Sequence, residues 1–175
     1  MSGGTLTIRG DAGDGLGLAM AGGAIVVFGD VGDEAGGAEP GAKAGMRGGA
    51  MLIHGNAGEQ LGTQLRNGWI AVGGRCGAYA GAGMRAGTVA VFGGHGLHPG
   101  LGMVRGTLLS AGPGPAPPAT FREACVYVPP FLAPLFAEFR QRGLAAATPA
   151  LARTSWRRWQ GDTLELSRGE ILRPT

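Results

Sequence analysis

Short segments of alternating apolar residues recur along the first two thirds of the chain. Each lies between two glycines, as in residues 23–29 and 87–93, and successive segments begin 19, 26, 19, 19 and 19 residues apart. Alternation with a period of two places both apolar residues of a segment on one face of a strand. The apolar pairs in phase are Leu6/Ile8, Ile25/Val27, Met51/Ile53, Ile70/Val72 and Val89/Val91. The spacing therefore predicts strands that stack in register, one from each repeat.

The rest of each repeat is rich in Gly and small polar residues. A unit of about 19 residues is too short for a strand with a packed helix, and this composition has little helix propensity. We therefore predict an all-β fold, a right-handed parallel β-helix (solenoid) of about six coils over residues 3–112, with the apolar pairs inside. The single 26-residue interval indicates a loop insertion within residues 36–45.

A Pro/Gly-rich linker, residues 113–118, separates the repeats from a tail with a different pattern, residues 119–175. Residues 121–128 are compatible with an extended segment. Helical spacing of apolar residues predicts a helix over residues 130–142, which Gly143 can end. Short alternating stretches predict strands at 163–166 and 170–172. We expect the tail to dock on the outer wall of the coils or to cap one end, while the first coil has no cap.

Composition excludes several classes of protein. Gly makes up 37 of 175 residues, but 44% of the chain is apolar and only 15% is charged, which is unlike a disordered chain. No apolar run reaches the ~18 residues of a membrane span, and the first residues lack the features of a signal peptide. We expect a cytoplasmic protein that binds neither membrane nor nucleic acid, since only Trp156-Arg157-Arg158-Trp159 resembles a nucleic-acid-binding surface.

Candidate chemistry is sparse. Residues 81–86 match a dinucleotide fingerprint, but a strand rather than a helix follows, so the match is a product of the repeat. Asp11, Asp14, Asp30 and Asp33 are interpreted as turn formers, and the three histidines do not complete a metal site with the two cysteines. We therefore predict no catalytic, cofactor-binding or metal-binding residue on this chain.

Two features are predicted to contact a partner. The outward-facing phase of the strands is apolar at Leu52, with Phe28 and Phe92 nearby, and a wall of this kind should be covered. Three arginines also follow the same repeat position and should form a stripe down one edge; they are Arg47, Arg66 and Arg85. If this wall is exposed in the isolated chain, Leu52→Asp is expected to spare folding and weaken assembly, whereas Val72→Asp should unfold the chain.

The repeats with glycine at fixed positions, such as GDGLG at 13–17 and GAYAGAG at 77–83, resemble the GXGXG domain. That domain occurs in the large subunit of glutamate synthase, and it forms most of one subunit of formylmethanofuran dehydrogenase, here called the GXGXG subunit. The tail, with WRRWQGD at 156–162 and RGEIL at 168–172, looks like the ending of GXGXG subunits. In methylotrophic bacteria these proteins belong to the formyltransferase/hydrolase complex.

The resemblance implies a noncatalytic structural subunit in one-carbon metabolism whose partners are the other subunits of the complex. It also implies that cofactors lie on those subunits, either a molybdenum or tungsten pterin in methanogens or a metal-dependent hydrolase centre in methylotrophs. Two alternatives stay open. One is a glutamate-synthase-like spacer subunit of an amidotransferase/oxidoreductase complex, and the other is a free-standing ligand-binding solenoid.

Overall fold

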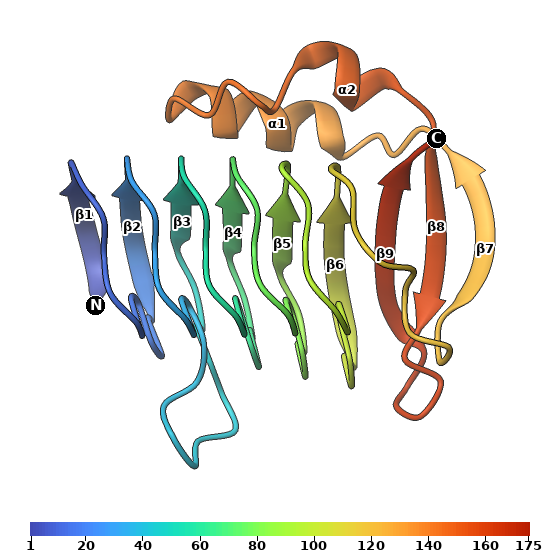
Figure 1. Cartoon of the computed structure of the whole chain (residues 1–175), viewed down its shortest axis with the longest axis horizontal. Coiled ribbons are helices and arrows are strands. Elements are labelled where there is room, and N and C mark those ends of the chain that lie inside the picture. The colour runs from blue at the N-terminus through green and yellow to red at the C-terminus, as the bar shows by residue number, and fades with distance from the viewer.

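The computed structural model describes all of residues 1–175 and contains one nine-stranded sheet with two helices over one face (Figure 1). The order of strands in the sheet is β1-β2-β3-β4-β5-β6-β9-β8-β7. The strands are β1 (Ser2–Ile8), β2 (Gly22–Val27), β3 (Ala50–Ile53), β4 (Trp69–Val72), β5 (Thr88–Val91), β6 (Arg105–Ser110), β7 (Arg122–Tyr127), β8 (Trp156–Gly161) and β9 (Arg168–Pro174). The helices are α1 (Leu132–Gln141) and α2 (Pro149–Arg153), and neither is long and apolar enough to cross a membrane.

The six repeats supply β1 to β6, which are parallel and stack in the register that the sequence spacing indicates. Ile25 pairs with Met51, which pairs with Ile70, and Ile70 pairs with Val89. Because equivalent residues lie directly above one another, their side chains join one continuous apolar cluster. The apolar residue that precedes each new strand, for example Met46 or Met84, is fully buried in the same cluster.

The predicted fold class, a right-handed parallel β-helix, is wrong. The strands belong to a single mixed sheet, in which β8 runs antiparallel to β7 and β9, and no closed solenoid forms. Opposite the sheet, the repeats touch through isolated one-residue bridges from Ala12 through Val31, Ala57 and Cys76 to His95. The physical reason is composition, because these segments consist of turns with many positive-φ residues and cannot sustain a second row of strands.

The C-terminal tail extends the sheet beyond the last repeat. β9 pairs in parallel with β6, so the last strand of the chain takes the place of a seventh repeat. β8 and β7 follow as antiparallel strands at the edge. The predicted helix is confirmed as α1, and residues 170–172 lie within β9. The strand predicted at 163–166 is wrong, since those residues form the turn between β8 and β9.

A second apolar cluster lies between the outer face of the sheet and the two helices. The strands contribute Leu52, Ala71, Ala90 and Leu109, which are at most 1% exposed. The tail contributes the fully buried Phe136, Phe139 and Trp156, among others. Helix α1 runs across the upper ends of the strands in Figure 1 and thereby covers the apolar outer wall.

Candidate functional site

The acidic residues of the repeats are engaged in holding one repeat to the next. Oδ1 of Asp11 accepts a hydrogen bond from the backbone N–H of Asp30 at 2.8 Å, and Oδ1 of Asp30 accepts one from Asn56 at 2.7 Å. A second row does the same, because Asp14 accepts from the N–H of Asp33 at 2.8 Å. These contacts agree with the interpretation of the aspartates as turn formers, since each carboxylate binds the backbone of the next repeat through Oδ1.

The three histidines have separate surroundings. His54 stacks on Phe28 with 4.7 Å between ring centroids, and His98 stacks on Tyr79 at 5.2 Å. His95 is 1% exposed. No group of three or more His, Cys, Asp or Glu residues is close enough together to hold a metal ion.

His95 belongs to a buried polar cluster that joins the fifth repeat to the end of the chain. Its Nε2 lies 2.9 Å from a guanidinium nitrogen of Arg173, and its Nδ1 lies 2.9 Å from the carbonyl oxygen of Gly96. Arginine can only donate, so Nε2 is the acceptor and Nδ1 carries the proton. Burial lowers the pKa of His95, and the nearby charges of Arg173 and Arg75 lower it further. The neutral imidazole therefore links β9 to the fifth repeat by accepting a hydrogen bond from Arg173.

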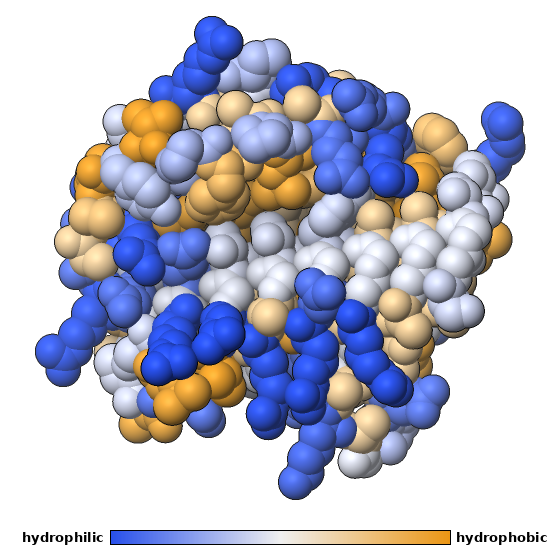
Figure 2. Space-filling model, turned by 180° about the vertical axis from the view of Figure 1, so that it is seen from behind, coloured by the Kyte–Doolittle hydropathy of each residue, from blue (hydrophilic) through white to orange (hydrophobic).

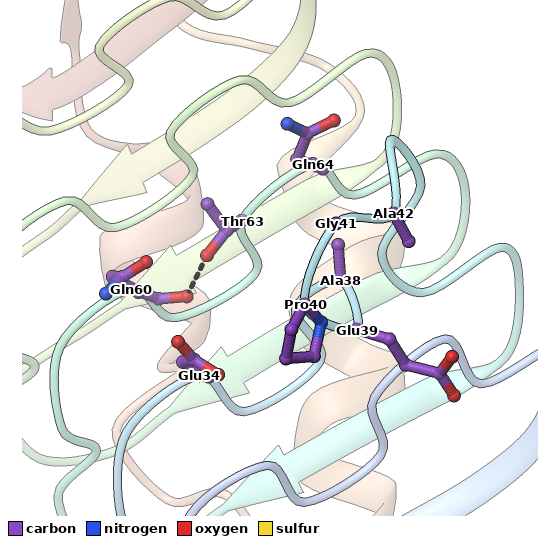
Figure 3. A pocket seen from close by; sticks show the side chains of 9 residues that line it. All are labelled: Glu34, Ala38, Glu39, Pro40, Gly41, Ala42, Gln60, Thr63 and Gln64. Carbon is purple, nitrogen blue, oxygen red and sulfur yellow. Dashed lines mark hydrogen bonds between the residues drawn. The ribbon is translucent and has the colours of Figure 1, made fainter.

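One cavity opens beside the insertion that lengthens one of the repeat intervals. It has a volume of about 210 Å³, and Figure 3 shows the side chains that surround it. Its walls are Glu34, Ala38, Glu39, Pro40, Gly41, Ala42, Gln60, Thr63 and Gln64. The Thr63 hydroxyl donates to the carbonyl oxygen of Gln60. The sequence spacing indicates the insertion but not this cavity, which forms only because the loop folds back against Gln60 and Gln64.

The apolar residues predicted to contact a partner are mostly covered by the chain itself. Leu52 is fully buried in the cluster beneath the helices, and the ring of Phe92 lies 5.3 Å from that of Phe136. Phe28 is 52% exposed. The condition under which Leu52→Asp would spare folding, an exposed outer wall, is therefore not met at Leu52. The new carboxylate would be buried without a partner and should destabilise the fold.

The three-arginine stripe (Arg47, Arg66 and Arg85) is present. The backbone N–H of Arg66 donates to the carbonyl of Met46, and the N–H of Arg85 donates to that of Leu65, both at 2.8 Å. The three side chains are exposed, and none forms one of the three salt bridges of the chain. A guanidinium nitrogen of Arg66 also donates to the carbonyl oxygen of Lys43 at 2.9 Å.

Stacked glycine-rich repeats, with acidic side chains that bind the backbone of the next repeat and an exposed stripe of arginines, define a scaffold built from repeats. A scan against protein-family models found no match, and a search of curated proteins found no significant one. A search of solved structures found the formyltransferase/hydrolase complex (FhcABCD) from Methylorubrum extorquens in complex with methylofuran.

The similarity to a chain of that complex extends over the whole of the present chain. The two are 40% identical, with a TM-score of 0.89, and the alignment covers 100% of this chain. The chain spans 64% of the length of the chain that it matches. At this identity and TM-score the two chains are similar in sequence and share their fold.

Proposed function

We propose that this chain is a structural subunit of a formyltransferase/hydrolase complex, in the position of its GXGXG subunit. The observation that carries the proposal is the 40% identity over the full chain, at a TM-score of 0.89, to a chain of such a complex. The solved complex holds methylofuran, so the assembly that we propose would transfer and hydrolyse formyl groups on a carrier of that kind. Its partners would be the other subunits.

A noncatalytic role is supported by what the chemically capable residues of the chain do. The aspartates of the repeats bind backbone amides of the next repeat. His95 and Arg173 bind each other between the repeats and β9. Burial raises the pKa of Cys76 to about 12, so its reactive thiolate form is suppressed at neutral pH. The catalytic centres, and any metal or pterin, would then lie on other chains.

The match also favours the formyltransferase/hydrolase assignment over a formylmethanofuran dehydrogenase, since the similar structure is a hydrolase complex. The glutamate-synthase-like role is not proposed, because no contact in the structure favours it.

The proposal is tested by purifying the tagged chain from its native host at low salt. Mass spectrometry would identify the proteins that elute with it, and the eluate would be assayed for formyl transfer and for formate release. We expect hydrolase and formyltransferase subunits in constant proportion, with both activities present. Elution of the chain alone, or with flavin and iron–sulfur proteins, would contradict the proposal.

A further inference from the structure

The edge of the sheet at which the parallel strands begin carries more positive charge than the repeat alone predicts. Arg47, Arg66 and Arg85 lie just before β3, β4 and β5, and Arg105 and Arg168 are the first residues of β6 and β9. Arg105 and Arg168 are register partners on the neighbouring parallel strands β6 and β9, and all five side chains are exposed. We refer to these five residues as the arginine row.

None of the five arginines of the row forms a salt bridge. The three salt bridges involve other arginines, namely Arg142, Arg157 and Arg158. Neighbouring strands are about 4.8 Å apart, so like charges are held side by side, where they repel one another. The folded chain gains no stability from such an arrangement. A negatively charged surface placed along the row would interact favourably with the arginines.

The turn between β8 and β9 presents apolar side chains beside this charge. Leu164 is 80% exposed and Leu166 is 60% exposed, the two highest values among the large apolar residues of the chain. The turn is nevertheless fixed, because the carboxylate of Asp162 accepts hydrogen bonds from the backbone N–H groups of Gly102 and Leu164, both at 3.0 Å. Burial of Asp162 acts to raise its pKa, but these bonds outweigh burial and the pKa is lowered.

Backbone hydrogen bonds place the turn between β8 and β9, which carries Leu164 and Leu166, next to the arginine row. The backbone N–H of Asp162 donates to the carbonyl of Met103. In an earlier repeat the N–H of Arg85 donates to the carbonyl of Leu65, which occupies the same repeat position as Met103. The turn therefore occupies a further position along this edge. Figure 2 shows long hydrophilic side chains side by side along the lower edge of the molecule, with an apolar patch at one end of them.

We propose that the arginine row together with Leu164 and Leu166 docks a protein partner whose surface has an apolar hollow bordered by carboxylates. An apolar centre with charged residues around it is the usual composition of a protein interface, and arginine is enriched there. Stacking of a single-stranded nucleic acid would instead need exposed aromatic residues beside the row. Trp156 is fully buried and Trp159 packs against the core, so these two aromatics are not available. This inference rests on the proposed function, since the partner would be another subunit.

The test compares paired variants in the tagged purification. Leu164→Asp/Leu166→Asp removes the apolar part, and Arg85→Glu/Arg105→Glu reverses charge at two arginines of the row. Arg153→Glu, an exposed arginine at the end of α2, is the matched control. We expect each double variant to retain less than a tenth of the partner, with thermal unfolding unchanged, while the control retains all of it.

Raising the salt concentration should weaken capture by the wild-type chain, because exposed charges are screened. Retention of the partner by both double variants would overturn this inference and leave the proposed function intact. Capture of nucleic acid that depends on the arginines and not on the leucines would also overturn it. A wild-type chain that captures no subunit would overturn the proposed function, and this inference with it.

Discussion

The placement of α1 on the outer face of the sheet can be tested at a single side chain. Phe136 is fully buried, and its ring lies 5.3 Å from that of Phe92, 6.0 Å from that of Phe139 and 6.4 Å from that of Trp156, between centroids. Phe136→Ala would remove the ring from the centre of this aromatic group and leave a cavity. Substitutions of this type cost about 3–5 kcal/mol of unfolding free energy.

The assay is equilibrium unfolding in urea, followed by tryptophan fluorescence, for which Trp156 is an adjacent reporter. Phe131, at the start of the same helix, is 37% exposed, so Phe131→Ala is the matched control, with an expected loss below about 1 kcal/mol. Equal losses for the two variants, or a loss below about 1 kcal/mol for Phe136→Ala, would show that α1 does not pack on the sheet in this way.

Three further predictions concern other parts of the chain. Because the pKa of His95 is lowered by burial, the folded chain binds a proton less readily than the unfolded chain, so stability should fall as the pH drops below about 6.5. His95→Gln should flatten this part of the profile in urea unfolding, and an unchanged profile would contradict the assignment. A thiol reagent at pH 8 should modify the exposed Cys125 and spare Cys76, which is buried with a pKa raised to about 12; labelling of both without unfolding would refute this. Gly87→Ala should destabilise the fold by more than about 1 kcal/mol, since φ is +90° and a Cβ would meet a backbone oxygen at 2.6 Å, whereas Gly3→Ala has open space and should cost much less. Thermal unfolding of both variants checks the difference.

The stacking of the repeats was predictable because it depends on local and periodic signals. The alternating pairs such as Ile70/Val72 are short-range patterns, and the 19-residue spacing aligns them without further information. The absence of a closed solenoid was not predictable in the same way. Segments between strands carry single bridges such as Ala57 to Cys76, and composition alone does not distinguish turns with one bridge from short strands.

The tail was harder to predict because its pairing is non-local. β9 reaches β6 across more than fifty intervening residues, and nothing near Arg168 in the sequence indicates that Arg105 is its neighbour. The alternation of Leu164 and Leu166 is typical of a strand, yet Asp162 holds these residues in a turn.

The arginine row was likewise predictable only where it follows the repeat. The three-arginine stripe follows from the repeat, since Arg47, Arg66 and Arg85 occupy one position in it. Arg105 is one residue out of phase, because Val104 takes the equivalent place. A search of the sequence for arginines at one fixed repeat position therefore misses Arg105, and only a search that tolerates an offset of one residue would find it.

The most direct measurement is a reconstitution of the complex with and without this chain. The hydrolase and formyltransferase subunits from the same host would be expressed together, and their mass in solution and formate release would be measured. We expect one species of constant stoichiometry that contains this chain, and a smaller or dissociated assembly when the chain is omitted. An intact, fully active assembly that forms without the chain and never incorporates it would contradict its role as a structural subunit.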